Sequence, residues 1–286
     1  MNAPDASQEN PAVVRERVRL LGVARIAAHA AAGVVRSRAP EIRTLDWQSK
    51  SRTDFVTEVD IAAEESLRAS ILRDVPGAAI VGEELTPDGA TNGDIAFVVD
   101  PLDGTTNFLH GYPWYAVSVG VLVGGVPAAG VVINIASGDE FAAAVGAGAT
   151  MNGETMHVSR ITEPARALIG TGFPFKTPHQ IDRYAEQFKA ITRDVAGIRR
   201  AGAAALDLTD VACGRFEAFW ELQLSPWDYA AGAVIIREAG GIVTNLRGDA
   251  PDNGASSIVA GNPIMHAWLL AAVRDPSSPS IERQSA

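Results

Sequence analysis

Hydrophobic residues recur along this chain with two different periods, and the period changes near Pro76-Gly77. Before that point, apolar residues recur at helical spacing over residues 11–35 and again over residues 59–75. Arginines lie on the other side of the first segment, which predicts an amphipathic helix there. The second segment ends at the Pro-Gly pair, whose residues stop a helix. The first quarter of the chain is therefore predicted to be mainly helical.

Short runs rich in valine and isoleucine, separated by glycines, follow the two helical segments and predict β-strands. These runs lie at residues 78–84, 95–100, 115–123 and 128–135. Turns and further strands are predicted over residues 139–159, where Asn152-Gly153 is typical of a hairpin. Further along the chain, the pattern predicts strands at residues 167–173, 216–222 and 241–245, and helices at residues 182–195, 202–214 and 225–241.

The order of these elements bears on the fold class. Helices and strands are mixed, but they do not alternate strictly enough for a simple doubly wound sheet. The sequence therefore predicts an α/β, or α+β, protein with mixed sheets. Because there is no internal repeat and no long linker, residues 1–275 are predicted to form a single domain, followed by a polar, disordered tail at residues 276–286.

Composition and charge narrow the classes of function. The 286 residues are 47% hydrophobic, which is enough for a sizeable core. The formal net charge of -10 argues against a nucleic-acid-binding protein, because phosphate neutralisation requires clustered lysines and arginines. The single Cys213 excludes an internal disulfide or a cysteine-based metal site. With no signal-peptide pattern and no apolar run of the roughly 18 residues that a membrane span needs, a soluble, cytoplasmic protein without membrane association is expected.

Two aspartates follow the apolar run at residues 95–99, where carboxylates need water, a cation or a hydrogen-bond donor. The turn at Asp100-Pro101-Leu102-Asp103 lets both carboxylates and the Leu102 carbonyl converge as oxygen ligands of the kind that Mg²⁺ prefers. The next residues, Gly104-Thr105-Thr106, can begin a helix whose amides bind an anion. Metal ligands beside an anion site indicate phosphoryl chemistry. The alternative is a surface turn, since Asp, Pro and Gly are the usual turn residues.

Three further acids lie at positions that fit this site. Glu83 follows an apolar run as Asp100 does, so two neighbouring strands could present carboxylates at one edge, although an exposed loop explains Glu83 equally well. Asp228 follows Ser225-Pro226, which fits a capped helix start as well as a metal ligand. Asp60 could likewise simply cap the second helix. No single acid decides between these interpretations.

In order and spacing, these segments together resemble the inositol monophosphatase family of Mg²⁺-dependent, lithium-sensitive phosphatases. The resemblance covers roughly residues 15–272 and is carried by Gly82-Glu83-Glu84, by DPLDGTTNFLHG from Asp100 and by WDYAAGAVIIREAGG from Trp227. It implies a single catalytic domain with the layered α-β-α-β-α sandwich of the inositol monophosphatase and fructose bisphosphatase type.

The resemblance also implies a role for each matching residue. Glu83, Asp100 and the Leu102 carbonyl would hold one Mg²⁺; Asp100, Asp103 and Asp228 would hold a second; a third, looser ion would use Glu83 and water. Thr105, paired with Asp60, would activate the attacking water, so that no covalent phosphoenzyme forms. Amides at Gly104 and Thr105 would hold the phosphate. The positions that contact the substrate alcohol are Gly202, Ala203, Ala204, Glu221 and Asp228.

The residues that follow the core motif, Thr106 to Gly111, resemble most the branch that converts inositol 1-phosphate to myo-inositol and phosphate. Histidinol phosphate, fructose 1,6-bisphosphate and 3'-phosphoadenosine 5'-phosphate are the alternative substrates. A phosphatase of the haloacid dehalogenase type is disfavoured, because two residues, not one, separate Asp100 from Asp103. The resemblance further implies a homodimer and, as an alternative of another class, a regulatory binding partner of the transcription machinery.

Overall fold

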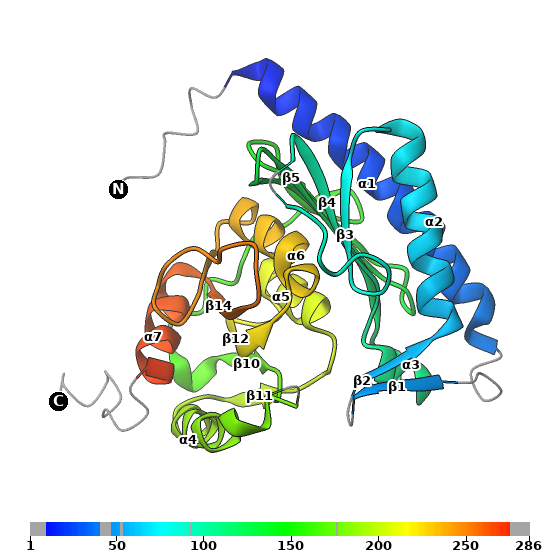
Figure 1. Cartoon of the computed structure of the whole chain (residues 1–286). Coiled ribbons are helices and arrows are strands. Elements are labelled where there is room, and N and C mark those ends of the chain that lie inside the picture. The colour runs from blue at the N-terminus through cyan, green and yellow to red at the C-terminus, as the bar shows by residue number, and fades with distance from the viewer. Residues whose placement is uncertain (1–9, 41–46, 52–53, 92, 176, 275–286) are drawn as a thin grey trace.

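The structure is a computed structural model that describes residues 10–40, 47–51, 54–91, 93–175 and 177–274. Its helices and two larger β-sheets are stacked in layers (Figure 1). The tail predicted at residues 276–286 lies outside the described residues.

The larger sheet has seven strands in the order β3-β4-β5-β6-β7-β8-β9. β3 and β4 are parallel, and every later pair is antiparallel. The predicted hairpin is confirmed: Met151 pairs with Glu154, and Asn152 and Gly153 both have the positive φ of a two-residue turn. The strands are β3 Ala79–Gly82, β4 Ile95–Asp103, β5 Ala116–Val123, β6 Val126–Asn134, β7 Glu140–Ala144, β8 Gly148–Met151 and β9 Glu154–Thr155.

Two long helices, α1 (Pro11–Arg38) and α2 (Glu58–Asp74), cover one face of this sheet (Figure 1). Both were predicted from their apolar periodicity, and the residues that set the period are the buried ones. Ala24 and Ala28 of α1 and Leu67 of α2 are fully buried in the cluster that joins the helices to the sheet. The small alanines let α1 lie close to its neighbours.

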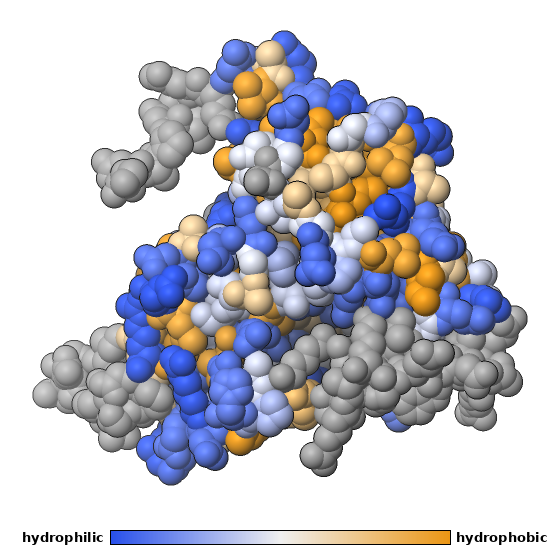
Figure 2. Space-filling model, viewed as in Figure 1, coloured by the Kyte–Doolittle hydropathy of each residue, from blue (hydrophilic) through white to orange (hydrophobic). Residues whose placement is uncertain are grey.

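α1 bears on the expected absence of a membrane span. By length and composition alone this helix is apolar enough to cross a membrane, although its sequence holds no uninterrupted apolar run of the length that a span needs. In this structure its buried side chains contact α2 and the sheet, which is the arrangement of a core helix. Some apolar side chains remain exposed on α1, including Val13 and Ile26, and Figure 2 shows apolar side chains over the α1–α2 layer.

The smaller sheet has five strands in the order β11-β10-β12-β14-β13. Helices α5 (Ala204–Ala212) and α6 (Pro226–Glu238) fill the space between the two sheets, while α4 (Ile181–Thr192) and α7 (Pro263–Arg274) cover the outer face (Figure 1). The predicted α-β-α-β-α sandwich with mixed sheets is therefore confirmed. The strands are β10 Leu168–Thr171, β11 Gly197–Arg199, β12 Ala218–Leu224, β13 Ile242–Thr244 and β14 Ser256–Gly261.

Two glycines of the large sheet set the distance between its inner face and α6. A Cβ on Gly130 would lie 2.6 Å from the Ala231 carbonyl oxygen, and a Cβ on Gly120 would lie 2.7 Å from the Ala230 Cβ. Real Cβ atoms do not approach other atoms so closely. The absence of a side chain at both positions thus lets the α6 backbone lie directly on β5 and β6.

Several elements were not predicted. The short hairpin of β1 (Trp47–Ser51) and β2 (Asp54–Thr57) was missed because its polar sequence carries no strand pattern. No element was predicted in residues 246–274, where β14 and α7 lie. Among the described strands, β1 and β2 pair with each other and with no third strand.

Candidate active site

The two strand ends that carry predicted acids are neighbours in the large sheet. β3 and β4 are parallel, with Gly82 opposite Val99. The Glu83 amide donates to the Val99 carbonyl at 3.3 Å, which places Glu83 beside Asp100 as predicted. β4 continues to Asp103, although the predicted strand ended at residue 100, and its pairing with β5 is irregular between these two aspartates. This irregularity turns both carboxylates toward one edge.

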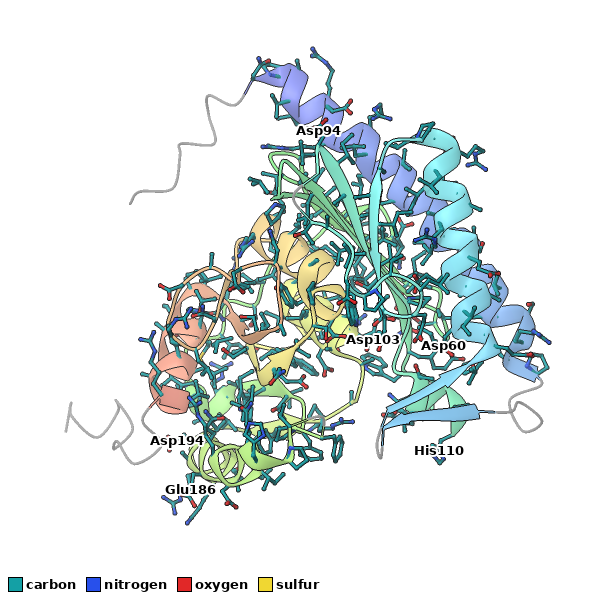
Figure 3. The ribbon with its side chains drawn as sticks, viewed as in Figure 1. Asp60, Asp94, Asp103, His110, Glu186 and Asp194 are labelled. Atoms are coloured by element: carbon teal, nitrogen blue, oxygen red, sulfur yellow. The ribbon has the colours of Figure 1, made fainter. Side chains whose placement is uncertain are left out.

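A cavity of about 390 Å³ lies at this edge. The predicted site residues that line it are Glu83, Asp100, Leu102, Asp103, Gly104, Thr105, Gly202, Ala203, Ala204, Glu221 and Asp228. Asp60 is the one predicted site residue that does not line it, and it lies behind Thr105. In Figure 3, Asp60 and Asp103 lie in the interior of the molecule, whereas Glu186 lies on the outer side of α4. The tertiary structure thus gathers segments from both halves of the chain.

Asp100 is a strongly perturbed acid of the cavity. It is 1% exposed, and this burial raises the pKa of its carboxyl well above the ordinary value. The negative charges of Glu83, Asp103 and Asp228 raise the pKa further, and only the Leu102 amide, which donates to Asp100 Oδ1 at 2.9 Å, opposes them. Acids that repel one another in a buried place are stabilised by a cation among them.

Asp103 and Asp228 also hold helix starts in place. Asp103 Oδ2 accepts a hydrogen bond from the Ala205 amide at 2.8 Å, in the first turn of α5. Asp228 Oδ2 accepts from the Ser225 amide at 2.6 Å, which is the capping arrangement predicted from Ser225-Pro226. Carboxylates at helix N-termini are stabilised by the helix dipole. A capping role leaves each side chain with a second oxygen for other contacts.

Thr105 and Asp60 form a hydrogen-bonded pair, as the resemblance implies. Thr105 Oγ1 lies 3.0 Å from Asp60 Oδ1 and 3.0 Å from the Leu102 carbonyl oxygen, so its hydroxyl can donate to either one. Asp60 Oδ2 accepts from the Thr57 amide at 2.9 Å and from the Thr57 hydroxyl. Burial raises the pKa of Asp60 despite these hydrogen bonds. The carboxylate is therefore fixed in orientation and more basic than an exposed aspartate.

The segment after Asp103 is a tight turn into the short helix α3 (Thr105–Leu109). Gly104 has φ of 89°, a conformation that favours glycine, and it precedes the first helical residue. The first turn of a helix has amides without partners inside the helix, and Gly104 and Thr105 lie at the start of α3. The Asn107 amide group donates to the Trp114 carbonyl at 2.7 Å and the Ala201 carbonyl at 2.9 Å. It thereby ties α3 to the segment that precedes α5.

The opposite wall of the cavity comes from the second half of the chain. Gly202, Ala203 and Ala204 lead into α5, and Glu221 projects from β12. A Cβ on Gly172 would lie 2.1 Å from a Glu221 carboxylate oxygen, so the absence of a side chain at Gly172 leaves room for that carboxylate.

Three residues near the site were missed from the sequence: Glu64, Asn107 and Asp207. Glu64 is fully buried and accepts from the Glu84 amide at 2.8 Å and the Leu85 amide at 3.1 Å, beside Glu83. A signal existed for it, because helical spacing from Asp60 puts residue 64 on the same buried face. Asp207 carried a similar signal in the sequence, because it lies among alanines and leucines in a predicted helix. Asn107 carried no such signal.

The donor set suits a hard divalent cation. Carboxylates and a backbone carbonyl are the ligands of Mg²⁺, and their mutual repulsion at Asp100 is what a bound cation would remove. Among the described residues, no three His, Cys, Asp or Glu side chains lie as close together as the ligands of a bound metal ion. The acids instead line an open cavity, which suits an ion that keeps several waters.

Solved structures share this architecture. The crystal structure of the extragenic suppressor protein suhB from Bartonella henselae aligns with a TM-score of 0.83 and 35% identity, covering 90% of this chain and 98% of that one. The structure of an inositol monophosphatase from Anabaena aligns with a TM-score of 0.78 and 33% identity, covering 93% and 98%. These neighbours define the class of protein as a layered α/β fold of the inositol monophosphatase type.

Sequence comparison gives the family. A sequence model of the inositol monophosphatase family matches residues 17–278, and the chain belongs to that family. The Nus factor SuhB of Pseudomonas aeruginosa is 40% identical over 92% of this chain and 99% of its own length. The family match confirms the resemblance noted in the sequence and supports a phosphatase.

Proposed function

We propose that this protein hydrolyses phosphate monoesters with Mg²⁺, and that inositol 1-phosphate is its substrate. The main support is that four acids line one cavity beside the hydrogen-bonded pair of Thr105 and Asp60. These acids are Glu83, Asp100, Asp103 and Asp228. An inositol monophosphatase from Anabaena with the same fold, at 33% identity, supports this choice of substrate class.

In this proposal Glu83, Asp100 and the Leu102 carbonyl would hold one Mg²⁺, and Asp103 and Asp228 would join Asp100 in holding a second. Bound Mg²⁺ would lower the pKa of the attacking water, and its positive charge would stabilise the phosphoryl oxygens and the leaving alkoxide. The chain's negative net charge of -10 then does not exclude an anionic substrate, since the local sign is reversed at the site.

The protein groups would act around these ions. The Thr105 hydroxyl would accept the proton of the attacking water while passing its own proton to the Asp60 carboxylate, 3.0 Å away, which would end as the proton acceptor. Amides at Gly104 and Thr105 would hold the phosphate. Asp228 and the wall formed by residues 202–204 and Glu221 would contact the leaving alcohol. Direct attack by water requires no covalent phosphoenzyme.

Several finer expectations belong to the same proposal. The enzyme would use two or three Mg²⁺ ions, would be inhibited by lithium, and would act as a cytoplasmic homodimer without membrane or direct nucleic-acid partners. Residues 1–275 would form one catalytic domain. Histidinol phosphate, fructose 1,6-bisphosphate and 3'-phosphoadenosine 5'-phosphate stay as alternative substrates of the same site.

A second function has support from the relatives. The protein from Pseudomonas aeruginosa is named a Nus factor, which favours a binding role in transcription as the alternative. The two functions make different demands on the cavity, because binding to a protein surface does not require Asp103 to be ionised. Asp103→Asn therefore separates them.

The test is phosphate release from inositol 1-phosphate, fructose 1,6-bisphosphate, histidinol phosphate and 3'-phosphoadenosine 5'-phosphate, each with Mg²⁺ and with EDTA. The expected result is Mg²⁺-dependent release with a preference for the inositol ester, and loss of release in Asp103→Asn. A preference for another ester would keep the phosphatase and change its substrate. No release from any ester by folded wild-type protein with saturating Mg²⁺ would contradict the proposed activity.

A further inference from the structure

Asn107 lines the cavity, and its side chain joins two segments that are far apart along the chain. Its Nδ2 atom donates to the Trp114 carbonyl at 2.7 Å and to the Ala201 carbonyl at 2.9 Å. Carbonyl oxygens only accept hydrogen bonds, so the nitrogen of the amide group, and not its oxygen, must face both of them. The contact with Ala201 spans 94 residues of the chain and connects α3 to the residues that lead into α5.

A second hydrogen bond connects the same two parts of the chain. Asp103 Oδ2 accepts from the Ala205 amide at 2.8 Å, and Ala205 follows Ala201 by four residues. The residues between these two contact points, 202–204, line the cavity. Both ends of this short wall are therefore tied to residues 103–107, which run from the end of β4 into α3.

The backbones of the two segments pack closely because two glycines meet there. Gly104 and Gly202 both have positive φ, of 89° and 93°, a conformation that favours glycine. A Cβ on Gly104 would lie 3.3 Å from the Ala203 Cβ, and a Cβ on Gly202 would lie 3.2 Å from Asn107 Nδ2. The glycines thus allow the close approach, and the amide group of Asn107 bonds across it.

We propose that Asn107 is a positioning residue, which fixes the distance between residues 202–204 and the turn at Gly104 and Thr105. This inference rests on the proposed function, in which the turn holds the phosphate and residues 202–204 contact the leaving alcohol. A phosphate ester spans both ends of the cavity, so an error in their separation misplaces the phosphorus atom relative to the attacking water. A misplacement of about 1 Å can lower the rate by about 10²-fold.

The phosphate end of the cavity has contacts that do not involve Asn107. Thr105 Oγ1 lies 3.0 Å from Asp60 Oδ1 and 3.0 Å from the Leu102 carbonyl oxygen. Loss of the Asn107 contacts should therefore displace residues 202–204 more than the turn at Thr105. Inorganic phosphate is small enough to bind at the phosphate end alone, whereas an ester needs both ends. The two ligands can thus report on the two ends separately.

Asn107→Asp is the main variant, because aspartate keeps the shape but replaces the N–H donors with an oxygen that repels both carbonyls. We expect kcat/KM for the ester that the wild type prefers to fall by about 10- to 100-fold, while the inhibition constant of inorganic phosphate changes by less than about twofold. Asn107→Ala removes the donors without adding charge. It should give the same pattern with a smaller decrease, and it serves if the aspartate variant does not fold.

A second measurement needs no substrate. Hydrogen exchange of the backbone amides over residues 200–206 should become faster in both Asn107 variants, because a segment that loses an anchoring hydrogen bond opens more often. The amides of α2 provide an internal reference, since no contact of the Asn107 side chain reaches that helix among the described residues.

Asn253 provides the matched control. Its Nδ2 atom donates to the Gly125 carbonyl at 2.7 Å across 128 residues of the chain, and it is not one of the described residues that line the cavity. Asn253→Asp should lower the melting temperature, because it removes the same kind of long-range hydrogen bond. It should leave kcat/KM, the inhibition constant of phosphate and the exchange over residues 200–206 unchanged.

The outcomes are separable. If Asn107→Asp keeps the wild-type kcat/KM, or weakens phosphate binding as much as it lowers kcat/KM, Asn107 does not set this distance and the inference is wrong. A lower melting temperature with unchanged kinetics, as expected for Asn253→Asp, would likewise make Asn107 a structural residue only. Failure of the folded wild type to hydrolyse any of the four esters would overturn the proposed phosphatase function instead. The exchange measurement would then decide alone, and unchanged exchange over residues 200–206 would refute the anchoring role.

Discussion

Glu64 links α2 to the loop that carries Glu83. Its carboxylate is fully buried and accepts hydrogen bonds from the Glu84 amide at 2.8 Å and the Leu85 amide at 3.1 Å. A Cβ on Gly82 would lie 2.1 Å from a Glu64 carboxylate oxygen, so the absence of a side chain at residue 82 leaves room for this carboxylate. The Glu64 side chain thus ties the loop after β3 to α2.

Glu64→Gln tests this arrangement with little change in shape. Glutamine offers one carbonyl oxygen where glutamate offers two carboxylate oxygens, so one of the two amides loses its acceptor. A buried donor left without a partner costs about 1–3 kcal/mol. Relief of the buried charge opposes part of this loss, since burial raises the pKa of Glu64. We therefore expect Glu64→Gln to lower the free energy of unfolding by an amount within this range of about 1–3 kcal/mol.

The assay is urea unfolding of the metal-free protein in EDTA, so that stability is measured without bound cations. Glu65→Gln is the control, because Glu65 is the next residue of the same helix and is exposed. An exposed substitution of this kind changes stability by less than about 0.5 kcal/mol. Equal midpoints for the two variants would refute the reasoning, because the two amide contacts would then contribute nothing.

Three further predictions concern the site and the core. Asp60→Asn should lower kcat by about 10²- to 10⁴-fold, as loss of a general base does, with an unchanged melting temperature separating this from misfolding. Gly130→Ala should lower the free energy of unfolding by about 1–3 kcal/mol because its Cβ would press on α6, whereas Gly22→Ala, in α1 with open space around it, should raise it by about 0.4–1 kcal/mol. Urea unfolding midpoints that shift in the same direction for both variants would contradict this contrast. Because the pKa of Asp100 is raised in the folded protein, its folded state in EDTA binds more protons than the unfolded chain, and stability should rise as the pH falls through the raised pKa towards the ordinary value of the unfolded chain. Mg²⁺ or Asp100→Asn should flatten this slope, and an unchanged slope in both would show that the acids do not repel one another.

Local patterns were sufficient to predict most of the elements and the centre of the site. The α1 and α2 helices, the strands before Glu83 and Asp100, and the Asn152-Gly153 hairpin follow from periodicity and turn chemistry, which act within a few residues. The same holds for the cap at Asp228, since a capping box is read from four consecutive residues.

Other features could not be predicted locally. The β1–β2 hairpin has no apolar pattern in its sequence, and among the described strands it forms a separate two-stranded sheet. The length and composition of α1 suit a membrane span and a core helix equally, and only its contacts with α2 and the sheet distinguish them. The sequence places Asp207 among apolar residues of a predicted helix, but only the position of α5 between the two sheets shows that this residue lines the cavity.

The sequence by itself determined which segments form helices and strands, which residues can act as oxygen ligands, and the family. Only the tertiary structure decided that the charge of Asp228, far away along the chain, raises the pKa of Asp100, that Glu64 fixes the loop of Glu83, and that Asp207 Oδ1 is buried with no hydrogen-bond partner among the described residues. Burial and charge interactions depend on distance in space and on the exclusion of water. Neither is encoded in any short segment of the chain, so both arise when the layers pack.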